Sequence, residues 1–363
     1  MRRRDTTHLR NSRFFVAILL LNLFLVWARA QNQPAGDAFP PQVAPPKASN
    51  PAPQEASKSD PAKQNAADPA PAQEQSGQED NGFVFHKQVE EVVLHATVVD
   101  DKQRMVMNLD KSAFNVFEDG KAQNIVSFRR EDIPVAMGIV IDNSGSMREK
   151  REKVNKAAIN LVKASNRQDE AFIVNFNDEY YLDQDFTNDL SKMREALEKV
   201  DTRGGTALYD AVVASADHLK KNARLEKRVL FVVTDGEDNE SQESLEQAIR
   251  RLQEENGPTV YALGLLGDEK ARRARKALQF IAEKTGGIAF FPKTLDQVDE
   301  ISSQVAHDIR SQYTIGYKPT NPKSTGGYRA IKVEAKAKGY GKLIVRTKSG
   351  YYAGQERAST SGK

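Results

Sequence analysis

The feature that most constrains the fold of this chain is an alternation of apolar runs and amphipathic helical patterns across residues 134–310. The apolar runs are short and nearly continuous, at residues 135–141, 170–176, 227–233, 259–266 and 288–291. The helical patterns lie between and after them, at residues 152–166, 189–200, 207–222, 244–256, 274–286 and 295–310. Strands that are apolar on both sides are typical of a parallel sheet that helices cover on both faces. The alternation therefore predicts a doubly wound, mostly parallel α/β domain.

One run in this region departs from the parallel pattern. Residues 180–186 follow Asn177 and Asp178 so closely that no crossover helix fits before them. A strand that returns through a tight connection pairs antiparallel with the strand before it. We expect this run to form an antiparallel strand at the edge of the sheet.

Short β-rich runs flank the α/β domain on both sides. Residues 83–130 contain several such runs separated by charged turns, one of them at Asp119 and Gly120, and residues 311–354 contain three more with Gly and Pro between them. Each set alone is too small for a stable sheet. We expect the two sets to pack together as one small antiparallel β domain.

The first 30 residues have the composition of a secretory signal peptide. A basic start is followed by an apolar run from Phe14 to Trp27 and by small residues at Ala28 and Ala30. This pattern predicts export to a periplasm or the outside of the cell, with cleavage after Ala30. An uncleaved anchor is the alternative, although the run is shorter than the about 20 residues of a spanning helix.

Residues 31–81 and 355–363 lack the apolar side chains that a folded core needs. The first segment is rich in Pro, Ala, Gln and Asn. Such a composition cannot bury enough surface to offset the entropy of ordering the chain. We predict a disordered spacer at 31–81 and a disordered tail at 355–363.

The charge and the cysteine content exclude several classes of protein. Residues 1–30 carry six arginines and one aspartate, so their removal takes the formal net charge from +3 to −2. A chain near neutrality lacks the excess of positive charge that is typical of nucleic-acid-binding proteins. There is no cysteine, hence no disulfide and no lipid-modified cysteine. No apolar stretch after the leader is long enough to span a membrane.

Oxygen-bearing side chains cluster where the predicted strands end. Asp142, Ser144 and Ser146 follow the first apolar run, Thr206 precedes a helical pattern, and Asp235 follows the run at 227–233. The carboxyl ends of parallel strands meet at one edge of a sheet, where open α/β sheets carry their functional loops. Five oxygens without thiol or imidazole suit Mg²⁺ or Mn²⁺, and Ca²⁺ less well, whereas they disfavour zinc.

Each of these motifs also has an ordinary structural interpretation. Asp142 and Ser144 are common helix N-cap residues. The Gly-Gly-Thr segment that ends at Thr206 reads as a loop and cap, and the Thr-Asp-Gly segment around Asp235 reads as a turn. The prediction of a metal site depends on all three segments reaching the same edge.

The order of the motifs resembles the von Willebrand factor A family with its metal-ion-dependent adhesion site. DxSxS follows an apolar strand, and GGT and TDG come later in the chain. The resemblance covers residues 134–310, and the flanking stretches FEDGKAQNIVSFRREDIP and QYTIGYKP to GYY are similar to those of bacterial exported proteins related to this family.

The resemblance implies a role for each site residue. Ser144 and Ser146 would bind the metal ion directly through their hydroxyls, and Asp142, Thr206 and Asp235 would bind it directly or through a water molecule. It also implies an open coordination position for an Asp or Glu carboxylate of a protein partner. The resemblance thus predicts a cation-dependent protein-binding module of the cell envelope.

An enzyme is the rival class, and a metal-independent assembly scaffold of the envelope is another alternative. A serine nucleophile needs a base, and none of the five histidines falls in a strand-end loop of the α/β domain. No GxSxG, GxxxxGK or GxGxxG motif follows a strand. A hydrolase that uses only a metal ion and carboxylates stays open, but we predict a binding module without enzymatic activity.

Overall fold

The computed structural model describes residues 90–130, 132–266 and 271–354. The predicted signal peptide, spacer and C-terminal tail lie outside the described residues, as do residues 83–89 of the predicted N-terminal β unit. Among the helices that are described, none has the length and apolar character that crossing a membrane requires. All described residues belong to one compact unit.

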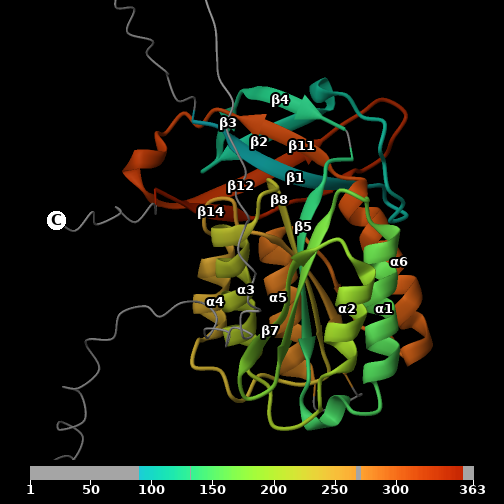
Figure 1. The fold of residues 1–363 in the computed structure, drawn as a ribbon. Coiled ribbons are helices and arrows are strands. Elements are labelled where there is room, and N and C mark those ends of the chain that lie inside the picture. The colour runs from blue at the N-terminus through green and yellow to red at the C-terminus, as the bar shows by residue number, and fades with distance from the viewer. Residues whose placement is uncertain (1–89, 131, 267–270, 355–363) are drawn as a thin grey trace, which may run out of the picture. The chain divides into compact units, whose positions relative to one another are not determined.

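A mixed sheet of six strands forms the centre of the α/β domain (Figure 1). Its order is β10-β9-β8-β5-β6-β7, with five parallel strands and β7 antiparallel to β6 at the edge. This confirms the predicted fold class and the antiparallel edge strand. The strands are β5 (Val135–Asp142), β6 (Glu170–Phe176), β7 (Tyr180–Thr187), β8 (Lys227–Thr234), β9 (Thr259–Gly264) and β10 (Ala289–Phe290).

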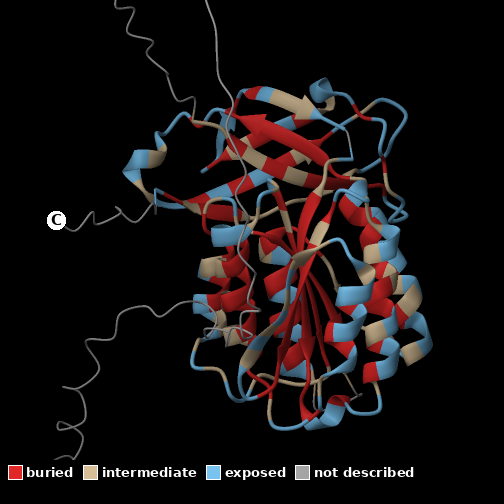
Figure 2. Cartoon of the chain, in the orientation of Figure 1, coloured by how far each residue is buried: buried red, intermediate tan, exposed pale blue. Residues whose placement is uncertain are grey.

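Helices cover both faces of this sheet, as the sequence predicts. Alternate residues of β5 point to opposite faces, so Ile139 packs with α1, α2 and α6 whereas Val140 packs with α3, α4 and α5. Figure 2 shows the resulting buried layer along the strands. The helices are α1 (Arg151–Ala164), α2 (Leu190–Glu198), α3 (Leu208–Asn222), α4 (Leu245–Leu252), α5 (Arg272–Thr285) and α6 (Val298–Arg310). Short 3₁₀ turns are η1 (Lys111–Ala113), η2 (Gly145–Met147), η3 (Leu295–Gln297) and η4 (Lys323–Thr325).

The flanking segments form two four-stranded antiparallel sheets, with orders β13-β1-β11-β4 and β14-β12-β2-β3. Each sheet combines strands from before and after the α/β domain, as expected for a β domain assembled from both flanks. The strands are β1 (Val92–Val99), β2 (Phe114–Glu118), β3 (Lys121–Gln123), β4 (Ile125–Arg129), β11 (Tyr313–Tyr317), β12 (Gly327–Ala335), β13 (Ile344–Arg346) and β14 (Gly350–Ala353). Their inner faces share one apolar core.

Buried polar contacts connect the β sheets to the α/β domain. Asp308 of α6 accepts a hydrogen bond from the hydroxyl of Tyr261 in β9 at 2.6 Å and one from Arg346 Nη2 in β13 at 2.7 Å. Gln312 Nε2 also donates to the Tyr261 hydroxyl, at 3.2 Å. Burial raises the pKa of Tyr261 well above its usual value, so the tyrosine stays a neutral donor to Asp308.

Candidate functional site

The predicted site residues lie at the carboxyl-end edge of the six-stranded sheet. Asp142 is the last residue of β5, and Asp235 directly follows β8, the parallel neighbour of β5. Ser144 and Ser146 lie on the loop and 3₁₀ turn after β5. Thr206 lies two residues before α3 begins. Parallel pairing of β5 with β8 thus places residues that are far apart in sequence at one edge.

Ser144, Ser146 and Asp235 form a chain of contacts. The Oγ atoms of Ser144 and Ser146 are 3.2 Å apart, and Ser146 Oγ donates a hydrogen bond to Asp235 Oδ1 at 2.7 Å. Ser144, Ser146 and Thr206 line one open hollow with a volume of about 560 Å³, whose other walls come from the loops at Gly204–Gly205 and 236–239. The hollow is thus lined by three hydroxyl-bearing residues and, on the loop at 236–239, by the acidic residues Glu237 and Asp238.

Asp142 lies beneath this hollow and is fully buried. Its Oδ1 accepts a hydrogen bond from the Ser144 backbone N–H at 2.8 Å, and its Oδ2 accepts one from Thr234 Oγ1 at 2.6 Å. Burial raises the pKa of Asp142, against the effect of these hydrogen bonds, and the nearby charge of Asp235 raises it further. Asp142 therefore orients the serine loop, and an added positive charge nearby would stabilise its ionised form.

The loop that carries Thr206 is fixed by its neighbours. Thr206 N–H donates to Asn239 Oδ1 at 2.8 Å, and its carbonyl accepts from Asn239 N–H at 3.0 Å. Gly205 N–H donates to Asp178 Oδ1 at 2.5 Å. Gly204 has a φ of +74°, and a Cβ at this position would lie 2.2 Å from Asp178 Oδ2. The glycine is required both by the backbone conformation and by the close approach of Asp178.

Lys150 is a site residue that the sequence analysis missed. Its ammonium forms an ion pair with Asp235 Oδ2 and a long hydrogen bond of 3.4 Å to the Ser146 carbonyl. The Asp235 side chain is only 1% exposed, whereas that of Lys150 is 28% exposed. Lys150 lies at the N-cap of α1, where the helix dipole disfavours a positive charge. That unfavourable position is the sequence signal that could have identified it.

A second cation lies next to Lys150 in the sequence. Arg151 is 7% exposed, and its Nη1 donates to Asn175 Oδ1 at 3.1 Å. Burial lowers its pKa to about 10, while the negative charges of Asp183 and Asp142 oppose this shift. Lys150 thus pairs with Asp235, while the charges of Asp183 and Asp142 both act on Arg151.

Other polar residues near this edge stabilise its loops. Asp210, one helical turn after Thr206 in the sequence, accepts hydrogen bonds from the backbone N–H groups of Gln242 at 2.9 Å and Glu243 at 2.8 Å. Arg148 Nη2 donates to the Thr202 carbonyl at 3.2 Å. Both side chains hold neighbouring loops in place.

The spacing of the Ser144, Ser146 and Asp235 oxygens fits neighbouring ligands of a divalent cation of the size of Mg²⁺. Ligand oxygens on adjacent corners of an octahedron with bonds of 2.0–2.1 Å lie about 3 Å apart. The serine hydroxyls are 3.2 Å apart, and Ser146 Oγ is 2.7 Å from Asp235 Oδ1. In the part of the chain that is described, no group of three or more His, Cys, Asp or Glu side chains forms a metal site. A site at this edge would thus depend on hydroxyl ligands.

A protein-family model matches part of the α/β domain. Residues 137–237 match the family model described as von Willebrand factor type A domain. The matched segment contains Asp142, Ser144, Ser146, Thr206 and Asp235. No curated protein sequence matches the chain.

Several solved structures are similar to parts of this chain. A von Willebrand factor type A protein from Catenulispora acidiphila is 12% identical, with 74% of each chain covered and a TM-score of 0.44. An aerotolerance-related membrane protein from Bacteroides fragilis is 19% identical, with 48% of this chain and 98% of that chain covered and a TM-score of 0.40. The PilB minor pilin from Streptococcus sanguinis is 12% identical, with 50% of this chain and 63% of the pilin covered and a TM-score of 0.42. The match thus spans less than two thirds of the pilin.

Proposed function

We propose that this chain, whose α/β domain is a von Willebrand factor type A domain, binds a protein partner through a divalent cation. Asp142, Ser144, Ser146, Thr206 and Asp235 would hold the ion, Mg²⁺ or Mn²⁺ in preference to Ca²⁺. The observation that carries the proposal is the open hollow lined by hydroxyls above two carboxylates. When bound, the ion would attract an Asp or Glu carboxylate of the partner.

The buried and the accessible residues of the proposed site have different roles. The buried Asp142 fixes the serine loop from below, because its two oxygens already accept hydrogen bonds from Ser144 and Thr234. The hydroxyls of Ser144, Ser146 and Thr206 face the hollow and carry no charge. Neutral ligands leave a divalent ion with much of its positive charge, which favours capture of an external carboxylate.

The leader at residues 1–30 supports an exported location for this binding activity. Its basic start, apolar run and small residues are those of a secretory signal peptide. We propose that the protein acts in a periplasm or outside the cell, as the resemblance to bacterial exported proteins suggests.

The contacts around the serines favour binding over hydrolysis. Ser146 donates to a carboxylate, and Ser144 contacts Ser146. Among the described residues, His95 lies in β1, His218 in α3 and His307 in α6, all outside the loops that line the hollow. A serine without a base to take its proton is a poor nucleophile.

Cation titration of the full chain tests the metal site. Chelated protein should bind Mg²⁺ or Mn²⁺ in calorimetry, and the cation should raise the melting temperature because it binds only the folded state. Asp142→Ala should abolish both responses. Identical melting curves and no heat up to millimolar cation would remove the proposed site.

Partner capture from envelope extract tests the binding function. Beads carrying the full chain should retain a partner in Mg²⁺ and release it in chelator, and a variant with both Ser144→Ala and Ser146→Ala should retain none. Equal retention in chelator would point to a metal-independent scaffold. Cation-dependent turnover of a small ester or phosphate, with no complex recovered, would point to a hydrolase.

A further inference from the structure

A second cavity lies at the opposite edge of the six-stranded sheet from the candidate metal site. Its volume is about 220 Å³. Arg228 and Thr259 line it near the amino ends of β8 and β9. His95 and Thr314 line it from β1 and β11, and Lys348 lines it from the connection between β13 and β14. A buried water needs only about 10–15 Å³ of such volume, so the cavity has room for a ligand of several heavy atoms.

Two cations line this cavity without a carboxylate partner. Within the described residues, the Lys348 ammonium takes part in no hydrogen bond or ion pair. Arg228 Nη1 reaches the Asn256 carbonyl only at 3.5 Å, and its Nε is buried without an acceptor. The acidic residue on the wall, Glu226, is exposed and forms no ion pair in the described part of the chain. Unpaired cations beside a cavity are costly unless a ligand supplies the negative charge.

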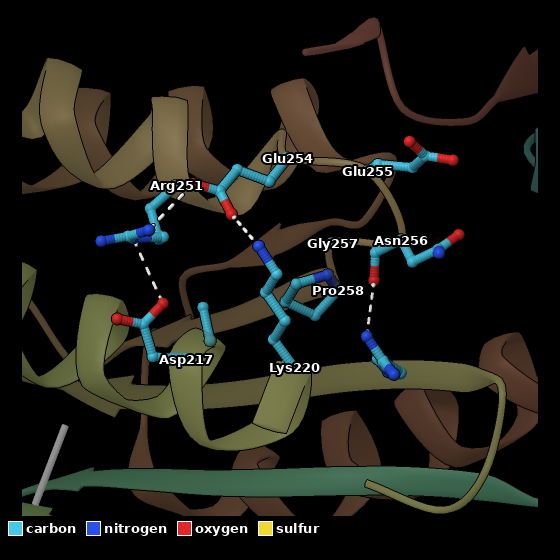
Figure 3. A pocket seen from close by; sticks show the side chains of 10 residues that line it. Asp217, Lys220, Arg251, Glu254, Glu255, Asn256, Gly257 and Pro258 are labelled. Carbon is cyan, nitrogen blue, oxygen red and sulfur yellow. Dashed lines mark hydrogen bonds and ion pairs between the residues drawn. The ribbon is translucent and has the colours of Figure 1, made fainter. Parts of the chain in front are cut away.

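A neighbouring pocket shows how this protein pairs charges that serve its structure (Figure 3). There Glu254 bonds to Lys220 at 2.8 Å and to Arg251 at 2.9 Å, and Arg251 also pairs with Asp217 at 3.2 Å. The volume of that pocket is about 10 Å³, the size of one water molecule. Arg228 lines both spaces, but Lys348 lines only the larger cavity, and in the described part of the chain it has no such ion pair.

The pKa values of two lining groups are lowered by burial. Burial lowers the pKa of Lys348 to about 8, while the negative charge of Glu255 opposes this shift. The pKa of His95 is well below its usual value, first because of burial and then because of the positive charges of Lys227, Lys348 and Arg129. His95 is thus neutral near pH 7, and its Nδ1 lies 3.3 Å from the Thr314 hydroxyl.

We propose that this cavity binds a small organic dianion, a dicarboxylate or a phosphate ester, between Lys348 and Arg228. The two cations supply the matching charge, and the side chains of Asn256, Thr259 and Thr314 on its wall are polar groups able to bond to the anion's oxygens. Such a ligand would contact both the α/β domain and the flanking β strands. This site is separate from the metal centre and does not depend on the proposed partner binding.

Anion titration of the full chain tests the proposal. Calorimetry with malonate and with inorganic phosphate, each against chloride at equal ionic strength, should give one site per chain and a higher melting temperature for at least one probe. Tighter binding of malonate would identify a dicarboxylate site, and tighter binding of phosphate would identify a phosphate site. No binding of either probe up to about 20 mM, a concentration that would reveal even a weak site, would overturn the proposal.

Charge-removing variants locate the binding in the cavity. Lys348→Met and Arg228→Met should each weaken the anion about tenfold or more, the loss expected for one charged hydrogen bond. The control is Lys342→Met, which removes the same charge from an exposed position shortly before β13. An equal loss in the control would show nonspecific attraction and refute the site.

The stability of the ligand-free protein gives an independent test. If Lys348 serves a ligand, its charge is uncompensated without one, so Lys348→Met should raise the melting temperature in chloride and remove the increase caused by the anion. If Lys348 is a structural residue, the same variant should melt lower than Lys342→Met. A lower melting temperature combined with unchanged anion affinity would overturn the assignment.

Discussion

Lys150 should compete with the proposed divalent cation for Asp235. The ammonium contacts Asp235 Oδ2 and, more weakly, the Ser146 carbonyl, so it lies beside two residues of the proposed site. A cation that approaches Asp235 must displace this ammonium or bind beside a like charge. Replacement of Lys150 by Met, which keeps the aliphatic stem and removes the charge, should therefore strengthen cation binding.

The magnitude follows from the exposure of the pair. Two unit charges 4 Å apart interact by about 4 kcal/mol at an effective dielectric constant of about 20. The Lys150 side chain is 28% exposed, so solvent screening removes a large part of this energy. The interaction energy left after screening, about 1–2 kcal/mol, corresponds to about 5- to 30-fold tighter binding of Mg²⁺ to the Lys150→Met variant.

Calorimetric titration of Mg²⁺ and Mn²⁺ into the chelated full chain measures this change. The matched control is Lys153→Met, one turn later on α1, because Lys153 pairs with Asp296 and not with Asp235. The control should bind cations as the unmodified protein does. If Lys150→Met binds the cations with unchanged affinity, Lys150 does not compete with them. If the affinity increases equally in both variants, the increase comes from the change in net charge and not from competition for Asp235.

Two further predictions concern stability. Gly204→Ala should lower the free energy of unfolding, measured in urea, by about 1–2 kcal/mol more than Gly339→Ala does. Both glycines have positive φ, but of the two only a Cβ at Gly204 would meet another group within 4 Å. Equal losses in the two variants would contradict the predicted clash. Burial lowers the pKa of Lys227 in the folded protein to about 8, below the value in the unfolded chain. Between about pH 8 and 10 the unfolded chain therefore binds more protons than the folded protein. The free energy of unfolding should then rise with pH in this range. Lys348 acts with the same sign, and the Lys227→Met variant should show a smaller slope, whereas an unchanged slope would contradict the shift.

The sheet of the α/β domain is largely predictable because its signal is local. β5 and β8 are apolar runs that each end in a polar residue, and their predicted and observed limits differ by one residue. The prediction failed mainly at the end of β9, which stops at Gly264 rather than at residue 266. Leu265 N–H still donates to the carbonyl of Thr234, the last residue of β8, so the chain stays beside β8 for one residue after β9 ends.

The pairing of the flanking strands is not readable from local pattern. β1 pairs with β11 through Val92 and Tyr317, and β2 pairs with β12 through Glu118 and Ile331. These partners lie on opposite sides of the whole α/β domain in the sequence. The sequence indicates that the strands of each flank need partners from outside that flank. How the strands divide into two sheets depends on which strand faces pack against each other in the core, and local sequence patterns do not specify this.

The sequence predicts which residues reach the carboxyl-end edge but not how they share hydrogen bonds there. Strand ends place Asp142 and Asp235 together because β5 and β8 are parallel neighbours. In the structure Thr234 donates a hydrogen bond to the buried Asp142, and Lys150 pairs with Asp235. Both contacts depend on side-chain directions, which the spacing of residues in the sequence does not specify. The basic residue at the start of α1 was the usable signal, since a cation there opposes the helix dipole.

The two edges of the sheet differ in how their charges are balanced, and this difference determines how each should respond to a ligand. At the carboxyl-end edge, Lys150 already neutralises Asp235, so a divalent cation gains only the difference between its own attraction and that of the ammonium. At the amino-end edge, Lys348 and Arg228 form no ion pair among the described residues, although the charge of Glu255 acts on Lys348, so an anion has no ion pair to break. Added salt weakens both interactions by screening, but at the first edge it also weakens the Lys150 competitor. Anion affinity should therefore fall more steeply with ionic strength than cation affinity does, and Lys150→Met should steepen the salt dependence of the cation.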